Sequence, residues 1–267
     1  MTTLSEKVAV VVGSGGKGSG RAVARRFAAE GASVVVSDRD AGGAAETVDL
    51  IETDGGEASA YICEVNDEAQ VKGLVAFVEK QFGRLDVLVN TASRSELFKP
   101  SRPLEFWDEI IATELLGALW LTRAGIAVMV RGGHGGAIVN FSSTSAFAHG
   151  RLWGDNGSPS YDVAKMGVAR LTTTLGFLGP KENIRINCIA PDWIAVPELI
   201  GYFDSLTPEE RSQRGVPSRL TTPEEIAGAV LRLATDETLH GRIMVWWSDG
   251  EPHLIPWGDN GYATLEI

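Results

Sequence analysis

The sequence predicts a single α/β domain built on a doubly wound parallel sheet with helices on both faces. Short apolar runs alternate with longer stretches of helical periodicity, and this alternation continues from Val8 to Trp247. No linker composition, low-complexity tract or internal repeat divides the chain. Repeated strand–helix units joined by right-handed crossovers produce such a sheet. We therefore expect residues 1–267 to form one domain, which is long enough to bury a sizeable core.

Seven apolar runs have the length and composition of buried parallel strands. They cover residues 8–12, 34–37, 58–63, 85–89, 137–141, 184–188 and 243–247. Helical spacing is expected between them, in residues 19–30, in an alanine-rich stretch ending near 54, and in 67–82, 106–130, 161–178 and 223–234. Gly31 and Gly83 supply C-terminal stops, Thr222 is an N-cap, and a break near Thr113 is expected within the longest helix.

Two stretches interrupt this alternation, residues 144–160 and residues 190–221. Each directly follows a predicted strand, so both are expected at the carboxyl edge of the sheet, where ligands bind in open α/β folds. Residues 251–267 form a C-terminal extension that contains Trp257 and Tyr262.

Composition excludes several classes of function. The net charge of −11 argues against a nucleic-acid-binding surface, which needs clustered Lys and Arg. The two cysteines, Cys63 and Cys188, do not suggest a disulfide framework, and they fit a reducing cytoplasm. Residues 1–7 contain no apolar signal segment, and no apolar run is expected to reach the roughly 20 residues of a membrane span. A cytoplasmic protein without membrane contact is expected.

A glycine-rich segment, residues 13–20, follows the first strand and opens the first helix. Glycines allow the backbone to approach a pyrophosphate, and the helix N-terminus offers free N–H groups and partial positive charge. The candidate cofactor-binding residues of this segment are Gly13, Ser14, Lys17, Gly18, Ser19 and Gly20.

The end of the second strand carries Asp38. An acid at this position can accept hydrogen bonds from the adenosine ribose hydroxyls, and it repels a 2′-phosphate. NAD(H) is therefore favoured over NADP(H). Lys17 and Arg39 are the residues that would hold a 2′-phosphate if NADP(H) were bound.

Four further motifs follow in order along the chain. They are Asn90-Thr-Ala-Ser93, Ser142-Ser143 with Tyr161-x-x-x-Lys165, Asn187-Cys-Ile-Ala-Pro191, and Ser248-Asp-Gly250. Together with the glycine segment, they resemble the short-chain dehydrogenase/reductase family, and the likeness extends from Lys7 to about Gly250. Asn90-Thr-Ala-Ser93 is similar to the family's Asn-Asn-Ala-Gly, with Ser93 at the place of the glycine. The family has a Rossmann-like fold, so the resemblance agrees with the architecture expected from the strand–helix pattern.

The resemblance implies a proton-transfer site. Tyr161 would be the general acid/base, and Ser143 would hold the substrate oxygen and stabilise its developing charge. A free tyrosine has a pKa near ~10, too high for a base at neutral pH. Lys165, one helical turn further on, would lower that pKa by its charge and hold the nicotinamide ribose.

The resemblance also implies further cofactor contacts and an assembly. Glu64 and Val65 would meet the adenine, Asn90 and Ala92 would line the cofactor, and the backbone of Ile194 would meet the nicotinamide carboxamide. Family members commonly form tetramers or dimers, so a homo-oligomer is expected. No metal site is expected.

The sequence departs from the family pattern at several positions. Aligning on Gly18 and Gly20 puts Gly13 and Ser14 where Thr and Gly belong, whereas aligning on the first strand puts Val12 in place of the threonine and adds one residue to the loop. Asp192 and Val196 replace the family's glycine and threonine after Pro191. The cofactor edge must accommodate these differences.

The largest departure is Glu114, which stands in place of an asparagine that holds a water in the family's proton relay. A glutamate can also hold a water, or it can pair directly with Lys165 and offset the lysine's effect on Tyr161. Our hypothesis is that Glu114 belongs to the catalytic set and shifts the pH optimum upward.

The segment between Ser143 and Tyr161 is longer than is usual in the family. It contains His149, Arg151, Trp153 and Asp155, and with Trp193 it suggests a pocket shaped for an aromatic or alicyclic small molecule. The spacing of His149 and Asp155 does not support a metal site.

Three functions compete. The first is an NAD(H)-dependent oxidoreductase that interconverts a secondary alcohol and a ketone. The second keeps the fold but uses Tyr161 in non-redox chemistry, as a lyase or a hydrolase- or dehalogenase-like enzyme. The third is a non-catalytic dinucleotide sensor, against which the intact set of Ser143, Tyr161 and Lys165 argues.

Overall fold

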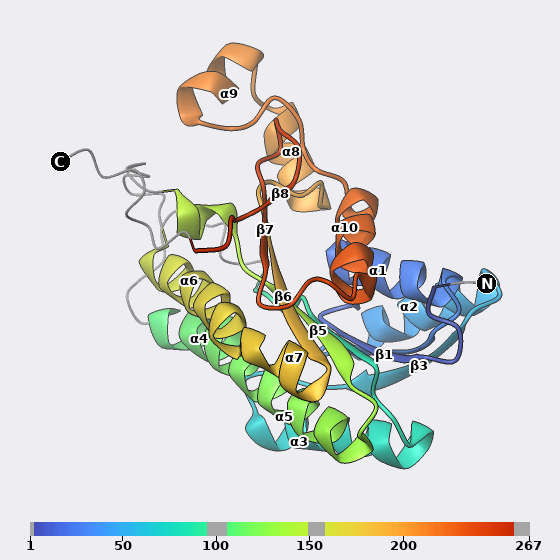
Figure 1. The fold of residues 1–267 in the computed structure, drawn as a ribbon. Helices are drawn as coiled ribbons and strands as arrows, with labels where there is room; N and C mark the ends of the chain where they lie inside the picture. The colour runs from blue at the N-terminus through green and yellow to red at the C-terminus, as the bar shows by residue number, and fades with distance from the viewer. Residues whose placement is uncertain (1–2, 95–105, 149–157, 259–267) are drawn as a thin grey trace.

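The computed structural model describes residues 3–94, 106–148 and 158–258. Its strands join in one sheet with the order β3-β2-β1-β4-β5-β6-β7-β8 (Figure 1). All neighbouring strands are parallel except β7 and β8, which are antiparallel. The strands are β1 Val8–Val12, β2 Ser33–Asp38, β3 Glu57–Ile62, β4 Val87–Asn90, β5 Gly136–Phe141, β6 Ile184–Pro191, β7 Ile243–Trp246 and β8 His253–Leu254.

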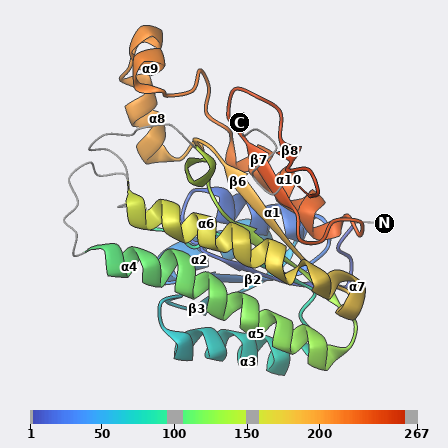
Figure 2. The same ribbon diagram turned by 60° about the vertical axis from the view of Figure 1, so that its left-hand side comes forward.

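Helices cover both faces of the sheet (Figure 2). On one face lie α1 Ser19–Ala29, α2 Ala41–Thr53 and α10 Pro223–Thr235. On the other lie α3 Glu68–Phe82, α4 Trp107–Ile111, α5 Gly117–Gly132 and α6 Pro159–Thr174. Short elements complete the described chain: the 3₁₀ turns η4 Thr144–Phe147 and η6 Leu175–Phe177, with α7 Leu178–Glu182, α8 Pro197–Asp204 and α9 Pro208–Arg214. The predicted doubly wound fold is confirmed.

The central strands are apolar along their whole length because both of their faces are covered. Every residue of β1, β4 and β7 is buried. On one face, Val23 and Phe27 of α1 belong to the same buried cluster as Ile226 and Val230 of α10. The second face is packed in the same way by α3 and α5. Burial on both faces explains why these strands lack the alternating polar pattern of a half-exposed sheet.

Local end signals set the helix bounds. Asp67 caps α3 by accepting hydrogen bonds from the backbone N–H groups of Ala69 and Gln70, and Gly83 ends that helix at φ +70°. Thr222 and Glu225 form a reciprocal capping box at the start of α10. The predicted cap at Thr222 and stop at Gly83 are confirmed.

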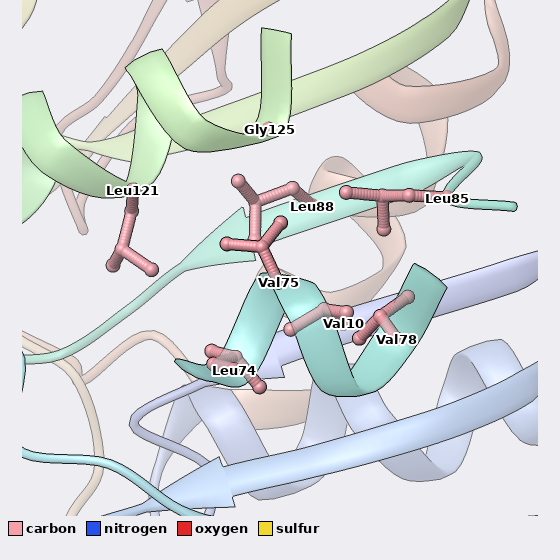
Figure 3. A pocket seen from close by; sticks show the side chains of 8 residues that line it. All are labelled: Val10, Leu74, Val75, Val78, Leu85, Leu88, Leu121 and Gly125. Carbon is pink, nitrogen blue, oxygen red and sulfur yellow. The ribbon is translucent and has the colours of Figure 1, made fainter. Parts of the chain in front are cut away.

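A small void lies between α3, α5 and the sheet (Figure 3). Its volume is about 10 Å³, and its lining is apolar. A Cβ atom added at Gly125 would lie 2.7 Å from Leu88 Cδ2, so this glycine allows α5 to pack closely on β4. The void is no larger than a water needs, and it therefore offers no ligand site.

Three details differ from the sequence prediction. The helix expected over 106–130 is continuous in direction, but its expected break near Thr113 is a π-helical segment, η3 Ala112–Leu116. The short strand β8 was not predicted. The expectation that no stretch is apolar enough for a membrane span is wrong, because the helix Trp107–Gly132 meets that test by length and composition. That helix packs against α3 and α6, as a core helix does.

Candidate active site

The predicted site residues gather at the carboxyl ends of β1, β2, β4, β5 and β6. Between β1 and β4 the strand order reverses, and this switch point is where open α/β sheets bind nucleotides. Val12 pairs with Ser37 on one side and with Asn90 on the other. The glycine segment, Asp38 and Asn90 therefore meet at one edge.

The glycine segment is a tight turn that side chains would disrupt. Strand β1 ends at Val12, and Gly13 turns the chain at φ +82°. A Cβ atom at Gly13 would lie 2.6 Å from the backbone nitrogen of Ala92. One at Gly20 would collide with the carbonyl oxygen of Gly13. Glycine is thus required at both positions by close backbone approach.

The side chains of this segment have different environments. The Ser14 hydroxyl donates to the Val11 carbonyl oxygen at 2.7 Å, so it supports the turn rather than a ligand. Lys17 is exposed. Helix α1 begins at Ser19 after Gly18, and the buried Ser19 hydroxyl has no hydrogen-bond partner.

The Asp38 carboxylate is held in place by backbone N–H groups. Its Oδ2 accepts from the Gly15 nitrogen at 2.8 Å, and its Oδ1 accepts from the Asp40 nitrogen at 3.0 Å. Arg39 lies beside it and forms an ion pair with Glu64 at 3.8 Å. The carboxylate is therefore fixed next to the glycine segment before any ligand binds.

The remaining expected cofactor residues lie around this edge. Asn90 is buried, and its Oδ1 has no partner. The Val65 side chain is buried, close to Gly117. Ile194 forms a β-bridge with Thr221, which fixes the chain just after β6. Two buried, unpartnered polar atoms, Ser19 Oγ and Asn90 Oδ1, beside a helix N-terminus fit a dinucleotide with phosphate and hydroxyl groups.

Val196, which replaces the threonine of the family pattern, also lies at this edge. A Cβ atom added at Gly18 would lie 3.3 Å from Val196 Cγ1, so Val196 packs over the glycine segment. Asp192, which replaces the family's glycine, accepts from Thr144 Oγ1 at 3.0 Å and from the Ser248 nitrogen at 3.2 Å. Asp192 therefore joins the chain after β6 to the ends of β5 and β7. Sequence reasoning did not predict this link.

Tyr161 and Lys165 lie one turn apart on α6. The ammonium nitrogen of Lys165 is 5.4 Å from the centre of the Tyr161 ring. Lys165 is buried, and its Nζ donates to the carbonyl oxygen of Phe141 at 3.0 Å. The Ser142 hydroxyl donates to the backbone carbonyl of Lys165 at 2.8 Å. These contacts fasten α6 to the end of β5, which carries Ser143.

Ser143 links the tyrosine to the turn after β5. Its hydroxyl oxygen accepts from Ser145 Oγ at 3.0 Å and from the Ser145 nitrogen at 3.2 Å. The Ser143 side chain also lies close enough to Tyr161 to lower the pKa of the phenol. The structure therefore brings Ser143, Tyr161 and Lys165 together.

Glu114 pairs directly with Lys165. Its Oε2 lies 2.9 Å from Lys165 Nζ, and both side chains are almost completely excluded from solvent. Its Oε1 accepts from Ser93 Oγ at 2.8 Å and from the Arg94 nitrogen at 3.0 Å. Glu114 therefore forms the direct ion pair with Lys165, one of the two arrangements that the sequence allows.

The charges around Tyr161 act in opposite directions. Burial raises the pKa of Tyr161, and the charge of Glu114 raises it further, while Lys165 and the Ser143 side chain lower it; the net pKa lies above the ordinary value. Burial by itself lowers the pKa of Lys165, but its neighbours, the Glu114 carboxylate first among them, outweigh burial and raise it. At neutral pH, the site thus holds a protonated phenol beside a charged lysine.

Several expected features lie elsewhere. His149, Arg151, Trp153 and Asp155 lie outside the described residues. Trp193 stacks on Tyr202 of α8, with ring centres 6.0 Å apart. Over the described part of the chain, no group of three or more His, Cys, Asp or Glu side chains could hold a metal ion.

Comparison with known proteins identifies the family. A family profile described as Enoyl-(Acyl carrier protein) reductase matches residues 15–245. The short-chain reductase protein NovJ of Streptomyces niveus is 38% identical over 252 residues, covering 88% of this chain and 92% of the relative. The chain belongs to the short-chain dehydrogenase/reductase family. It is an oxidoreductase of that family.

Other members are steroid enzymes. The 3beta-hydroxysteroid dehydrogenase 1 of Eggerthella lenta is 34% identical over 257 residues, covering 95% of this chain and 96% of the relative. A solved 7alpha-hydroxysteroid dehydrogenase, complexed with NADH and 7-oxo glycochenodeoxycholic acid, is 30% identical, with a TM-score of 0.79. That alignment covers 92% of this chain and 94% of the solved chain. The family uses NAD(P)(H).

Proposed function

We propose that this short-chain dehydrogenase/reductase uses NAD(H) to interconvert a secondary alcohol and a ketone. The observation that carries the proposal is the joint placement of Ser143, Tyr161 and Lys165 at the carboxyl edge of the sheet. The glycine segment and Asp38 lie at the same edge. A proton donor and a dinucleotide site in one place suit hydride transfer coupled to proton transfer.

In the reduction direction, Tyr161 donates its proton to the carbonyl oxygen of the substrate. The Ser143 hydroxyl donates a hydrogen bond to the same oxygen and stabilises its developing negative charge. Lys165, held by Phe141 and Glu114, stabilises the phenolate left on Tyr161. The bound nicotinamide supplies the hydride. Oxidation uses the same residues in reverse, with the phenolate of Tyr161 as the base.

The cofactor would be held by the residues around the switch point. Ser19 and the N–H groups at the start of α1 would bind the pyrophosphate, and Asp38 would accept from the adenosine ribose. The carboxylate of Asp38 argues for NAD(H), since it repels the 2′-phosphate of NADP(H). Lys17 and Arg39 would favour NADP(H), but Arg39 pairs with Glu64.

Glu114 adds a pH dependence to this chemistry. Because its charge raises the pKa of Tyr161, the phenol stays protonated to higher pH. A protonated phenol is ready for ketone reduction near neutral pH, whereas alcohol oxidation needs the phenolate. Oxidation should therefore be favoured at alkaline pH, which is the upward shift that the sequence led us to expect.

The substrate class proposed is an aromatic or alicyclic alcohol or ketone. Trp193 and Tyr202 present stacked rings from the chain after β6, where the substrate side of the edge lies. Two hydroxysteroid dehydrogenases among the relatives act on alicyclic substrates by their names. Flat aromatic walls suit fused or single rings of this kind.

The assembly proposed is a homo-oligomer in the cytoplasm. Exposed apolar side chains occur on neighbouring helices of one face, namely Val130 on α5 and Val163 and Met166 on α6. Family members typically form oligomers, and exposed apolar side chains favour association with a second copy. Light scattering of the purified chain measures the mass directly.

The deciding experiment follows the absorbance of reduced nicotinamide across a panel of cyclic and aromatic alcohols and ketones, with NAD(H) and NADP(H) in parallel. We expect turnover with NAD(H), faster reduction near neutral pH and faster oxidation at alkaline pH. Product formation without any absorbance change would support the non-redox alternative. Cofactor binding without product would support a dinucleotide sensor.

A further inference from the structure

Two departures from the family pattern touch each other in the folded chain. Ser93 stands where the family motif Asn-Asn-Ala-Gly has glycine, and Glu114 stands where it has asparagine. Ser93 Oγ donates to Glu114 Oε1 at 2.8 Å. A glycine at position 93 could not make this contact, because it has no side chain. The two substitutions therefore form one structural unit.

The two oxygens of the carboxylate have different partners. Oε1 accepts from Ser93 Oγ and from the Arg94 nitrogen, at 2.8 and 3.0 Å. Oε2 forms the ion pair with Lys165 Nζ at 2.9 Å, without a hydrogen bond from the described residues. Two hydrogen bonds and an opposite charge thus offset the burial of this carboxylate. Ser93 and Arg94 thus fix the direction in which Glu114 points.

The helix that carries Glu114 is adapted to this position. Glu114 lies in the π-helical segment η3, between α4 and α5. The wider turn of a π-helix rotates side chains relative to the regular helix on either side, and such segments often occur at functional sites. Within this segment, Glu114 contacts both the chain that follows β4, through Ser93, and α6, through Lys165.

We propose that Ser93 is a positioning residue of the proton-transfer site: its hydroxyl fixes Oε1 of the Glu114 carboxylate, so that Oε2 alone pairs with Lys165, and it thereby sets the charge that Tyr161 faces. This inference rests on the proposed function of Tyr161 as the acid/base. Ser93 itself touches neither Tyr161 nor Lys165 in the described contacts, and it acts through Glu114.

The direction of the effect follows from the charges near Tyr161. These are Lys165 and Asp162 on α6 and Glu114 on η3, with Cys188 on β6 acting on Lys165. Donation by Ser93 spreads the negative charge of Glu114 and holds Oε1 away from Lys165. If the hydroxyl is removed, the carboxylate is freer to turn fully to Lys165, and less of the lysine's charge remains to stabilise the phenolate. Ser93→Ala should therefore move phenolate formation to higher pH.

The test measures the titration of the Tyr161 phenol directly and does not rely on turnover. The chain has four tyrosines, so ¹³C-labelling of the tyrosine ring carbon that bears oxygen gives few NMR signals, and Tyr161→Phe assigns the relevant one. In Ser93→Ala we expect the Tyr161 signal to titrate about one pH unit higher, with alcohol oxidation about tenfold slower at neutral pH. Ser93→Thr, which keeps a hydroxyl, should restore both.

A double-mutant cycle tests that Ser93 acts through Glu114. In a Glu114→Asn background, Ser93→Ala should change neither the titration nor the rate. The matched control is Ser59→Ala on β3, which removes another buried hydroxyl that has no hydrogen-bond partner and lies outside the site. This control should leave both readouts unchanged.

The outcomes are distinct. An unchanged Tyr161 titration in Ser93→Ala, or an equal effect of Ser93→Ala with and without Glu114, overturns the positioning role. Absence of turnover on the whole substrate panel, with the NMR coupling intact, refutes the proposed function and leaves the link between Ser93, Glu114 and Tyr161 standing.

Discussion

The nucleotide edge and the proton-transfer site accommodate sequence change in different ways. At the nucleotide edge, the glycine segment departs from the family pattern, but its functional groups are backbone N–H groups and the N-terminus of α1. Gly15 donates to Asp38, and Gly13 makes the turn. At the proton-transfer site the groups are side chains, and the change to Glu114 brings a new ion pair and a new hydrogen bond. Backbone N–H groups remain available when a side chain changes, whereas a changed side chain in the proton-transfer site needs new partners.

The largest effect should come from Tyr161→Phe. Loss of the phenolic proton should lower kcat by about a thousandfold, within the range known for general acid/base groups. NADH affinity, measured by fluorescence titration, should stay close to that of the wild type, because the substitution leaves the glycine segment and Asp38, which we propose to hold the dinucleotide, unchanged. A parallel collapse of NADH binding would show that the two regions are not separable.

At the nucleotide edge, Gly20→Ala should lower NADH affinity by more than about tenfold. The added Cβ would collide with the carbonyl oxygen of Gly13 and lie 2.6 Å from Thr91 Oγ1, so the start of α1 must shift. Such overpacking costs about 1–3 kcal/mol of stability, which thermal unfolding measures. Gly16→Ala is the matched control, since a Cβ there meets nothing within 4 Å. Equal affinity in the two variants would contradict the tight-turn argument.

Asp38→Ser tests the side chain that we propose to set the choice between NAD(H) and NADP(H). Removing the carboxylate removes its repulsion of a 2′-phosphate, and a serine hydroxyl can still hydrogen-bond a ribose. The ratio of kcat/KM for NADPH over NADH should rise by about tenfold or more, the size of one lost charge interaction. An unchanged ratio would mean that the backbone alone sets the cofactor choice.

The smallest expected effect is that of Glu114→Asn on pH dependence. Because the charge of Glu114 raises the pKa of Tyr161, its removal should allow the phenolate to form at lower pH. The pH–rate profile for alcohol oxidation should reach its plateau about one unit lower than in the wild type. Superimposable profiles would exclude Glu114 from the proton-transfer set.

Much of the fold could be predicted because its signals are local. The apolar runs, the stop at Gly83 and the cap at Thr222 each depend on a few neighbouring residues. Strand β8 could not be predicted, since two residues, His253 and Leu254, pair with β7 only after the chain has turned back. The π-helical form of η3 also depends on packing, although a break near Thr113 was expected.

The site was predictable to a similar extent. Tyr161 and Lys165 share a helix, and Asp38 ends a strand, so their spacing along the chain indicates their place. The choice between a water and Lys165 as the partner of Glu114 depends on how η3 and α6 face each other, which spacing does not determine. Ser93 was visible only as a residue in place of a glycine, and its role as donor required the fold.

The packing of α1 against α10 has a consequence for synthesis of the protein. The two helices share one buried cluster, yet they occupy residues 19–29 and 223–235. At about 5–20 residues per second, the ribosome makes α10 on the order of ten to forty seconds after α1. During that interval Val23 and Phe27 lack their final covering. The nascent chain therefore presents an apolar helix face for most of its translation, which is the kind of surface that chaperones bind.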